Sequence, residues 1–190
     1  MPAHSQKIRS FFAFEIPESA REWIARHIIA PLKEVPAAVK WVERQNIHLT
    51  VRFLGEVEPK VLRKLVDTVR NEWEDIGVIN LTLGETGYFG RNYPRVIWVG
   101  LNGEIEKLER VHDFLERTCR KTGLGSDDKK FAPHITIGRV KSPAQTGKLI
   151  AAMKKIEIEP VEIKFSEMVL FKSTLTPEGP IYEALEHFAL

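Results

Sequence analysis

The tetrapeptide HLTV at residues 48–51 sets the interpretation of this chain, because the same His–apolar–Thr–apolar pattern recurs as HITI at residues 134–137. Successive side chains of a β-strand point to opposite faces. The histidine and threonine of each motif therefore share one face of a strand, and the two apolar residues share the other. The repeat predicts two equivalent strands, each presenting an imidazole and a hydroxyl on one side.

Around each motif the chain repeats one order of elements, strand–helix–strand–helix–strand, judged from apolar periodicity and from Gly and Pro stops. In the first half, strands are predicted at 11–16, 46–54 and 79–89, with helices at 18–32 and 59–73. In the second half, strands are predicted at 95–101, 130–140 and 161–172, with helices at 104–122 and 143–155. The internal duplication predicts an α+β fold with two like lobes related by a pseudo-two-fold axis.

The predicted architecture is a single two-lobed domain over residues 1–190. The sheets of the two lobes are expected to face a central cleft, with the helices outside. Small-ligand sites favour such clefts, so both motifs are expected to face it. The alternative is that the histidines and threonines simply face solvent on antiparallel sheets.

The composition is that of an ordinary globular protein, with 43% hydrophobic and 28% charged residues among 190. A formal net charge of +2 permits an anionic ligand but lacks the basic stripe of a nucleic-acid coat. The lone Cys119 excludes an internal disulfide and a cysteine-rich zinc site. The first residues lack the apolar core of a signal peptide, and no run approaches a membrane span. We expect a cytoplasmic monomer with no membrane partner.

With these motifs in place, the chain resembles the RNA 2′,3′-cyclic phosphodiesterases of the two-histidine phosphoesterase superfamily, historically called 2′-5′ RNA ligases. The segments that carry the resemblance are 9–13, 47–55, 94–100, 132–139 and 173–182. The resemblance implies a bilobal α+β fold with its active site between the lobes. It also implies hydrolysis of an RNA-terminal 2′,3′-cyclic phosphate to a 2′-phosphate without metal or cofactor, and a weak, reversible 2′-5′ joining of RNA.

Two histidines suit this chemistry, because an imidazole pKa of about 6.5 lets both protonation states exist near neutrality. The resemblance makes His134 the general base toward water and His48 the general acid toward the departing ribose oxygen. The residues alone do not distinguish these roles, which could be exchanged. Thr50 and Thr136 are expected to donate hydroxyl hydrogen bonds to the non-bridging phosphate oxygens.

Two arginines are candidates for phosphate contacts. The resemblance makes Arg139 the phosphate-binding arginine, although strict alternation puts it on the face opposite His134. A bulge at Gly138 would re-aim it. Arg52, four residues after His48, has matching parity without any bulge and is a second candidate for substrate contact.

Phe11 and Tyr182 are candidates for stacking on the base or ribose beside the cyclic phosphate, a contact that tolerates any base. For Phe11 the alternative is an ordinary core position, because it lies in an apolar strand.

Three other functions stay open at this point. Two equivalent histidines could bind zinc, but a catalytic zinc takes three protein ligands and neither motif supplies another at ligand spacing. The chain could be a non-catalytic module that binds nucleotides or RNA ends. It could also be a phosphodiesterase for another cyclic or 2′-5′ linked nucleotide.

Overall fold

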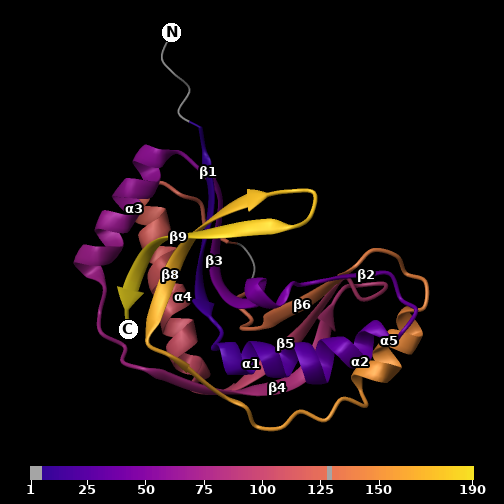
Figure 1. Ribbon diagram of the computed structural model, residues 1–190. Coiled ribbons are helices and arrows are strands. Elements are labelled where there is room, and N and C mark those ends of the chain that lie inside the picture. The colour runs from indigo at the N-terminus through magenta and orange to yellow at the C-terminus, as the bar shows by residue number, and fades with distance from the viewer. Residues whose placement is uncertain (1–5, 128–129) are drawn as a thin grey trace.

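The computed structural model describes residues 6–127 and 130–190. Its strands pair antiparallel in one curled sheet of order β7-β4-β5-β6-β3-β1-β8-β9, with β2 added on β6 (Figure 1). The strands are β1 (Ile8–Glu15), β2 (Val39–Trp41), β3 (His48–Val57), β4 (Ile79–Phe89), β5 (Val96–Gly103), β6 (Ile135–Val140), β7 (Glu162–Phe165), β8 (Glu167–Leu175) and β9 (Pro180–Ala189).

Two groups of helices cover the two halves of this sheet. The helical segments are α1 (Glu18–Trp23), the π-helical η1 (Ile24–Ile29), α2 (Ala30–Lys33), the 3₁₀ turn η2 (Arg44–Asn46), α3 (Pro59–Glu72), α4 (Ile105–Thr122) and α5 (Thr146–Met153). Helix α3 packs on α4, which contacts β3, whereas α2 contacts α5 near the other half (Figure 1). The predicted α+β class with helices outside is confirmed. Within residues 6–127 and 130–190, no helix is long and apolar enough to cross a membrane.

Local sequence explains where the two long helices begin and end. Pro59 occupies the first turn of α3, where its missing N–H leaves no helical hydrogen bond unmade. Helix α4 ends at Gly123, whose φ of 95° is the left-handed conformation that favours glycine. The fully buried Leu108, Val111 and Leu115 recur at helical spacing on the face of α4 that packs against the sheet.

The two halves of the sequence exchange elements across the pseudo-two-fold relation. Strand β4 of the first half pairs with β5 of the second, and β8 of the second half pairs with β1 of the first. Each lobe is therefore built from both halves of the chain. The two predicted sheets are also joined into one, through the β3–β6 pair Leu49↔Ile135.

Some predicted strands differ from those of the structure. The strand predicted at 161–172 is two strands, because β7 pairs with β4 while β8 pairs with β1 in the other lobe. Only Ser166 separates the two strands, and no Gly or Pro lies between them, so the sequence carries no signal of a break. Strand β6 begins at Ile135 rather than at residue 130. Strand β2 is only three residues long and β9 is mostly exposed, so neither shows the alternation that identifies a half-buried strand.

Leu49 should matter to stability more than its single ladder contact suggests, because its side chain is fully buried where the two half-sheets meet. We expect Leu49→Ala to lower the free energy of unfolding by about 2–5 kcal/mol, measured by urea denaturation. Leu175→Ala, at a side chain that is 67% exposed, is the matched control and should change it by less than about 0.5 kcal/mol. Equal effects of the two substitutions would contradict this account of the junction.

Candidate active site

The two histidine motifs lie side by side where β3 meets β6. His48 begins β3, and His134 directly precedes β6. In an antiparallel ladder, the residue before Leu49 faces the residue after Ile135, so each histidine neighbours the threonine of the other motif. Leu49 and Ile135 are buried in the main core, which places the imidazoles on the opposite face of the sheet.

Both imidazoles are held by the same backbone hydrogen bond. His48 Nδ1–H donates to the carbonyl oxygen of Asn46, and His134 Nδ1–H donates to that of Ala132, each over 2.7 Å. A carbonyl oxygen only accepts, so it fixes the proton of a neutral imidazole on Nδ1 and leaves Nε2 with a lone pair. The Thr50 hydroxyl lies 2.9 Å from His48 Nε2 and donates to it. Each Nε2 is therefore able to take up a proton and to release it.

Burial and neighbouring charge lower the pKa of both histidines. Desolvation is the main cause at His48, where the positive charges of Arg139 and His134 add to it while the bond to Asn46 opposes it. Desolvation also lowers the pKa of His134, again with a contribution from Arg139. The free site therefore holds neutral imidazoles near pH 7, and the negative charge of a bound phosphate would favour their protonation.

A β-bulge turns Arg139 toward the histidines. Ile97 pairs with Gly138 and Trp98 with Thr136, so Ile137 is the extra residue in β6. The bulge reverses the alternation and places Arg139 on the face of Thr136. The influence of Arg139 on the pKa of both histidines and of Tyr182 agrees with this position.

The equivalent bulge in β3 has the opposite consequence for Arg52. Phe12 pairs with Arg52 and Ala13 with Thr50, which leaves Val51 as the extra residue. Arg52 is 7% exposed, forms an ion pair with Glu116 of α4 and donates to the Gly125 carbonyl over 2.6 Å. The prediction that Arg52 shares the face of His48 is wrong, because parity was counted without the bulge. Arg52 connects β3 to α4 and the loop beyond it.

Phe11 and Tyr182 both lie against His48. Their rings are 5.0 and 5.2 Å from the imidazole, and 5.0 Å from each other. Phe11 is 4% exposed and belongs to a small apolar cluster with Ala13, Val169 and Phe171. Phe11 therefore supports the imidazole from within, whereas the half-buried Tyr182 of β9 is the more accessible of the two rings.

Three further residues lie at the site in addition to the candidate residues named above. Phe89 meets the His134 ring edge-on at 4.8 Å, and Trp98 lies 6.5 Å from it. Trp98 lies over Gly87, where an added Cβ would come within 2.2 Å of the indole. The third residue is Asn46, whose amide also donates to the Pro180 carbonyl over 3.0 Å. Phe89 and Trp98 are far from His134 in the sequence, so only the folded chain brings them to it, whereas Asn46 lies two residues before His48.

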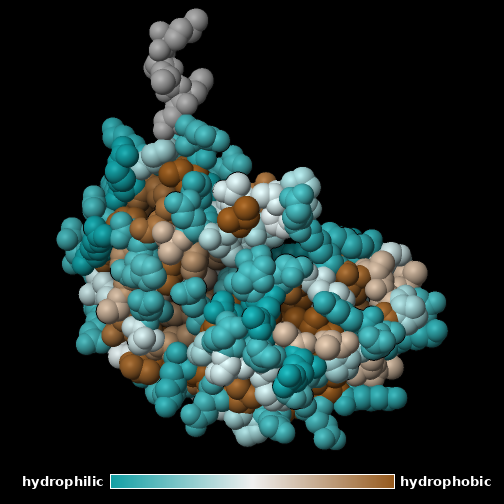
Figure 2. Space-filling model, viewed as in Figure 1, coloured by the Kyte–Doolittle hydropathy of each residue, from teal (hydrophilic) through white to brown (hydrophobic). Residues whose placement is uncertain are grey.

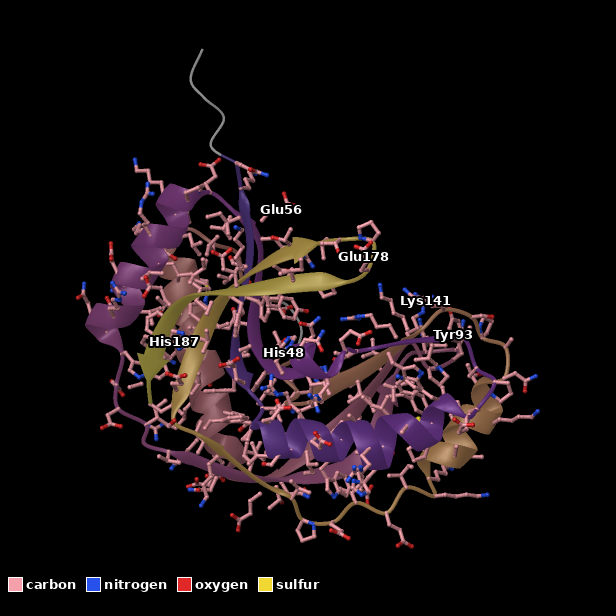
Figure 3. The ribbon with its side chains drawn as sticks, viewed as in Figure 1. His48, Glu56, Tyr93, Lys141, Glu178 and His187 are labelled. Carbon is pink, nitrogen blue, oxygen red and sulfur yellow. The ribbon has the colours of Figure 1, made fainter. Side chains whose placement is uncertain are left out.

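A pocket of about 340 Å³ opens beside His48 and is lined by residues of β1, α1, η2, β8 and β9. Figure 3 shows His48 between the β8–β9 hairpin and α1. Figure 2 shows hydrophobic atoms on that hairpin, where Leu175 and Ile181 are exposed. In the part of the chain that the structure describes, no group of three His, Cys, Asp or Glu side chains is placed to hold a metal ion.

The chain matches a family model described as "LigT like Phosphoesterase" twice, over residues 15–98 and 99–182. It is 33% identical to the RNA 2′,3′-cyclic phosphodiesterase of Methanothermobacter thermautotrophicus, over 97% of this chain and all of the relative. It is 34% identical to the protein of the same name from Thermotoga maritima, over 94% of this chain and 93% of the relative.

Two solved structures share the fold over nearly the whole chain. The crystal structure of Escherichia coli LigT with 3′-AMP has a TM-score of 0.76 at 27% identity, covering 97% of this chain and 99% of that one. TT0787 of Thermus thermophilus has a TM-score of 0.78 at 28% identity, covering 96% and 98%.

Removing the charge of Arg139 should raise the pKa of both histidines, because that charge disfavours their protonation. We expect the imidazole titrations of His48 and His134 in Arg139→Gln, followed by NMR, to have higher midpoints than in the wild type. Lys141→Gln is the control, because Lys141 does not contribute to the lowered pKa of either histidine. Unchanged midpoints in Arg139→Gln would contradict the position given to Arg139.

Arg52→Ala should lower the free energy of unfolding by about 3–5 kcal/mol, because it leaves the buried Glu116 carboxylate without its arginine partner. Arg70→Ala, which removes the more exposed ion pair with Glu186, should cost less than about 1 kcal/mol. Both values follow from urea denaturation. A normally stable Arg52→Ala protein with weakened phosphate binding would restore Arg52 as a substrate contact.

Proposed function

The chain belongs to the LigT-like phosphoesterase family, and on this basis we propose that it hydrolyses RNA-terminal 2′,3′-cyclic phosphates to 2′-phosphates. The observation that carries the proposal is the pair of identically anchored imidazoles, His48 and His134, each with Nε2 able to exchange a proton. Two relatives named RNA 2′,3′-cyclic phosphodiesterase support this choice of substrate over other phosphoesters.

In the proposed reaction, His134 Nε2 takes a proton from a water molecule whose oxygen attacks the phosphorus. The bond from phosphorus to the 3′ oxygen breaks, and His48 Nε2–H gives that oxygen its proton. The phosphate remains on the 2′ oxygen, and the two histidines have exchanged their protonation states. The same sequence, with the 5′-hydroxyl of a second RNA in place of water, would join two RNA ends by a 2′-5′ bond.

The remaining residues of the two motifs stabilise the phosphate in this proposal. Arg139 and the hydroxyls of Thr50 and Thr136 bind the non-bridging oxygens, where negative charge grows in the transition state. When His48 is protonated at Nε2, the N–H donates and the Thr50 oxygen accepts, which is the reverse of the bond in the free site. The Thr50 hydroxyl proton is then available to a phosphate oxygen.

Other parts of the proposal rest on the sequence. We propose that residues 1–190 act as one two-lobed domain, that the reaction needs no metal or cofactor, and that RNA ends carrying a cyclic phosphate are the partner. A monomeric state and a cytoplasmic location remain predictions.

The deciding test is turnover of a short RNA ending in a 2′,3′-cyclic phosphate, with EDTA present. We expect a 2′-phosphate product from the wild type. His48→Ala and His134→Ala should each be slower by about 10²–10⁴-fold, because each removes one proton-transfer group. His187→Ala is the matched control, because His187 is exposed on β9, away from the cleft, and it should keep the wild-type rate (Figure 3).

Two results would overturn the proposal. One is a wild type that is inactive on the cyclic phosphate end, and the other is His48→Ala and His134→Ala variants that are as active as the His187→Ala control. A binding module would keep its affinity for the RNA end in the His48→Ala, His134→Ala double variant without turning it over. A zinc enzyme would lose activity in EDTA and regain it with added zinc.

A further inference from the structure

The pocket beside His48 makes the cleft asymmetric. It is lined by His48, but His134, Thr136 and Arg139 take no part in its walls. This inference requires the proposed function, in which His48 protonates the 3′ oxygen. His48 then lies next to the ribose of the terminal nucleoside. The terminal nucleoside therefore lies on the His48 side, and the pocket has the size and position to receive it.

A free carboxylate lies in this pocket. Glu15 is the cross-strand partner of His48 in the β1–β3 ladder, so both side chains stand on the cleft face. Glu15 is exposed and lines the pocket, and its carboxylate has no hydrogen bond or ion pair with any other described residue. A negative charge here opposes phosphate binding, so this carboxylate is suited to a hydrogen-bond donor on another part of the ligand.

The chemistry of the substrate limits which donor this is. In a 2′,3′-cyclic phosphate end, both hydroxyls of the terminal ribose are esterified, so its sugar has no hydrogen-bond donor left. The donors of that nucleoside are on its base. Guanine has two adjacent donors, N1–H and the 2-amino group, which match the two oxygens of a carboxylate, whereas the other bases offer a carboxylate one donor group.

Two other features of the pocket suit a base. Ile181, which is 60% exposed, and Tyr182 of β9 provide apolar surface for the flat face of the ring. Arg21 of α1 also lines the pocket, with its guanidinium held by Glu18 and by the Gln45 carbonyl. A guanidinium only donates, and guanine carries an acceptor, O6, next to its N1–H.

We propose that this pocket binds the base of the nucleotide that carries the cyclic phosphate, and that Glu15 makes guanine the preferred base. Glu15 is a specificity-determining residue in this proposal, and the proton transfers remain with the two histidines.

The test compares kcat/KM for RNAs that differ only in a terminal G, A, C or U cyclic phosphate, and for 2′,3′-cyclic GMP and UMP. We expect the wild type to prefer guanine over uracil by about tenfold or more, as one bidentate contact provides. The mononucleotides should show the same preference, because they keep the base. They lack the 2′-hydroxyl of a preceding nucleotide, so Glu15 cannot bind that group in place of the base.

Glu15→Gln keeps the shape of the side chain but replaces one acceptor oxygen with a donor amide, so the guanine-to-uracil ratio should fall toward one. Glu157→Gln makes the same charge change at an exposed residue between α5 and β7 and should keep the wild-type ratio. A wild type without base preference, or a Glu15→Gln protein with an unchanged ratio, would overturn the inference while leaving the proposed function in place. No turnover of any end would overturn both.

Discussion

The site depends on one constraint, the meeting of β3 and β6 at the pair Leu49↔Ile135. This pair lies where the two pseudo-symmetric halves touch, with both apolar side chains in the core. The strict alternation of the strands then places both histidines on the opposite face, close to the symmetry axis. Each imidazole is fixed by the carbonyl oxygen two residues before it. A duplicated motif thereby becomes a pair of imidazoles aimed into one cleft.

The proposed reaction gives the two histidines different roles, and the structure shows how the symmetry of the two halves is broken around them. The bulges in β3 and β6 are equivalent, so the position that holds Arg139 in one half is occupied by Phe53 in the other. Phe53 is partly exposed and lies beneath the guanidinium of Arg9, at 4.5 Å. The strong cation therefore belongs to the His134 motif, while the pocket opens beside His48. A nearly symmetric scaffold thus carries a directional site.

Bulges also explain where reasoning from the sequence succeeded and where it failed. Counting alternation from His48 selected Arg52 for the cleft, but one extra residue sends it to the other face, where Glu116 pairs with it. The equivalent extra residue in β6 turns Arg139 into the cleft, as a bulge at Gly138 would do. A bulge depends on how two strands register with each other, and neither strand by itself encodes that register. Phe89 and Trp98 were absent from the predicted site residues for a related reason, since their contacts with His134 are made across strands.

The sequence by itself determined the α+β class, the duplication, most helices and strands, and the two motifs that present imidazole and hydroxyl on one face. These features follow from local periodicity and from Pro and Gly positions, which act over a few residues. Only the tertiary structure decided that β4 and β8 cross to the opposite half, that the half-sheets join into one, and which arginine enters the cleft. These outcomes depend on pairing between distant segments, where the burial of apolar faces against one another selects the partner and register.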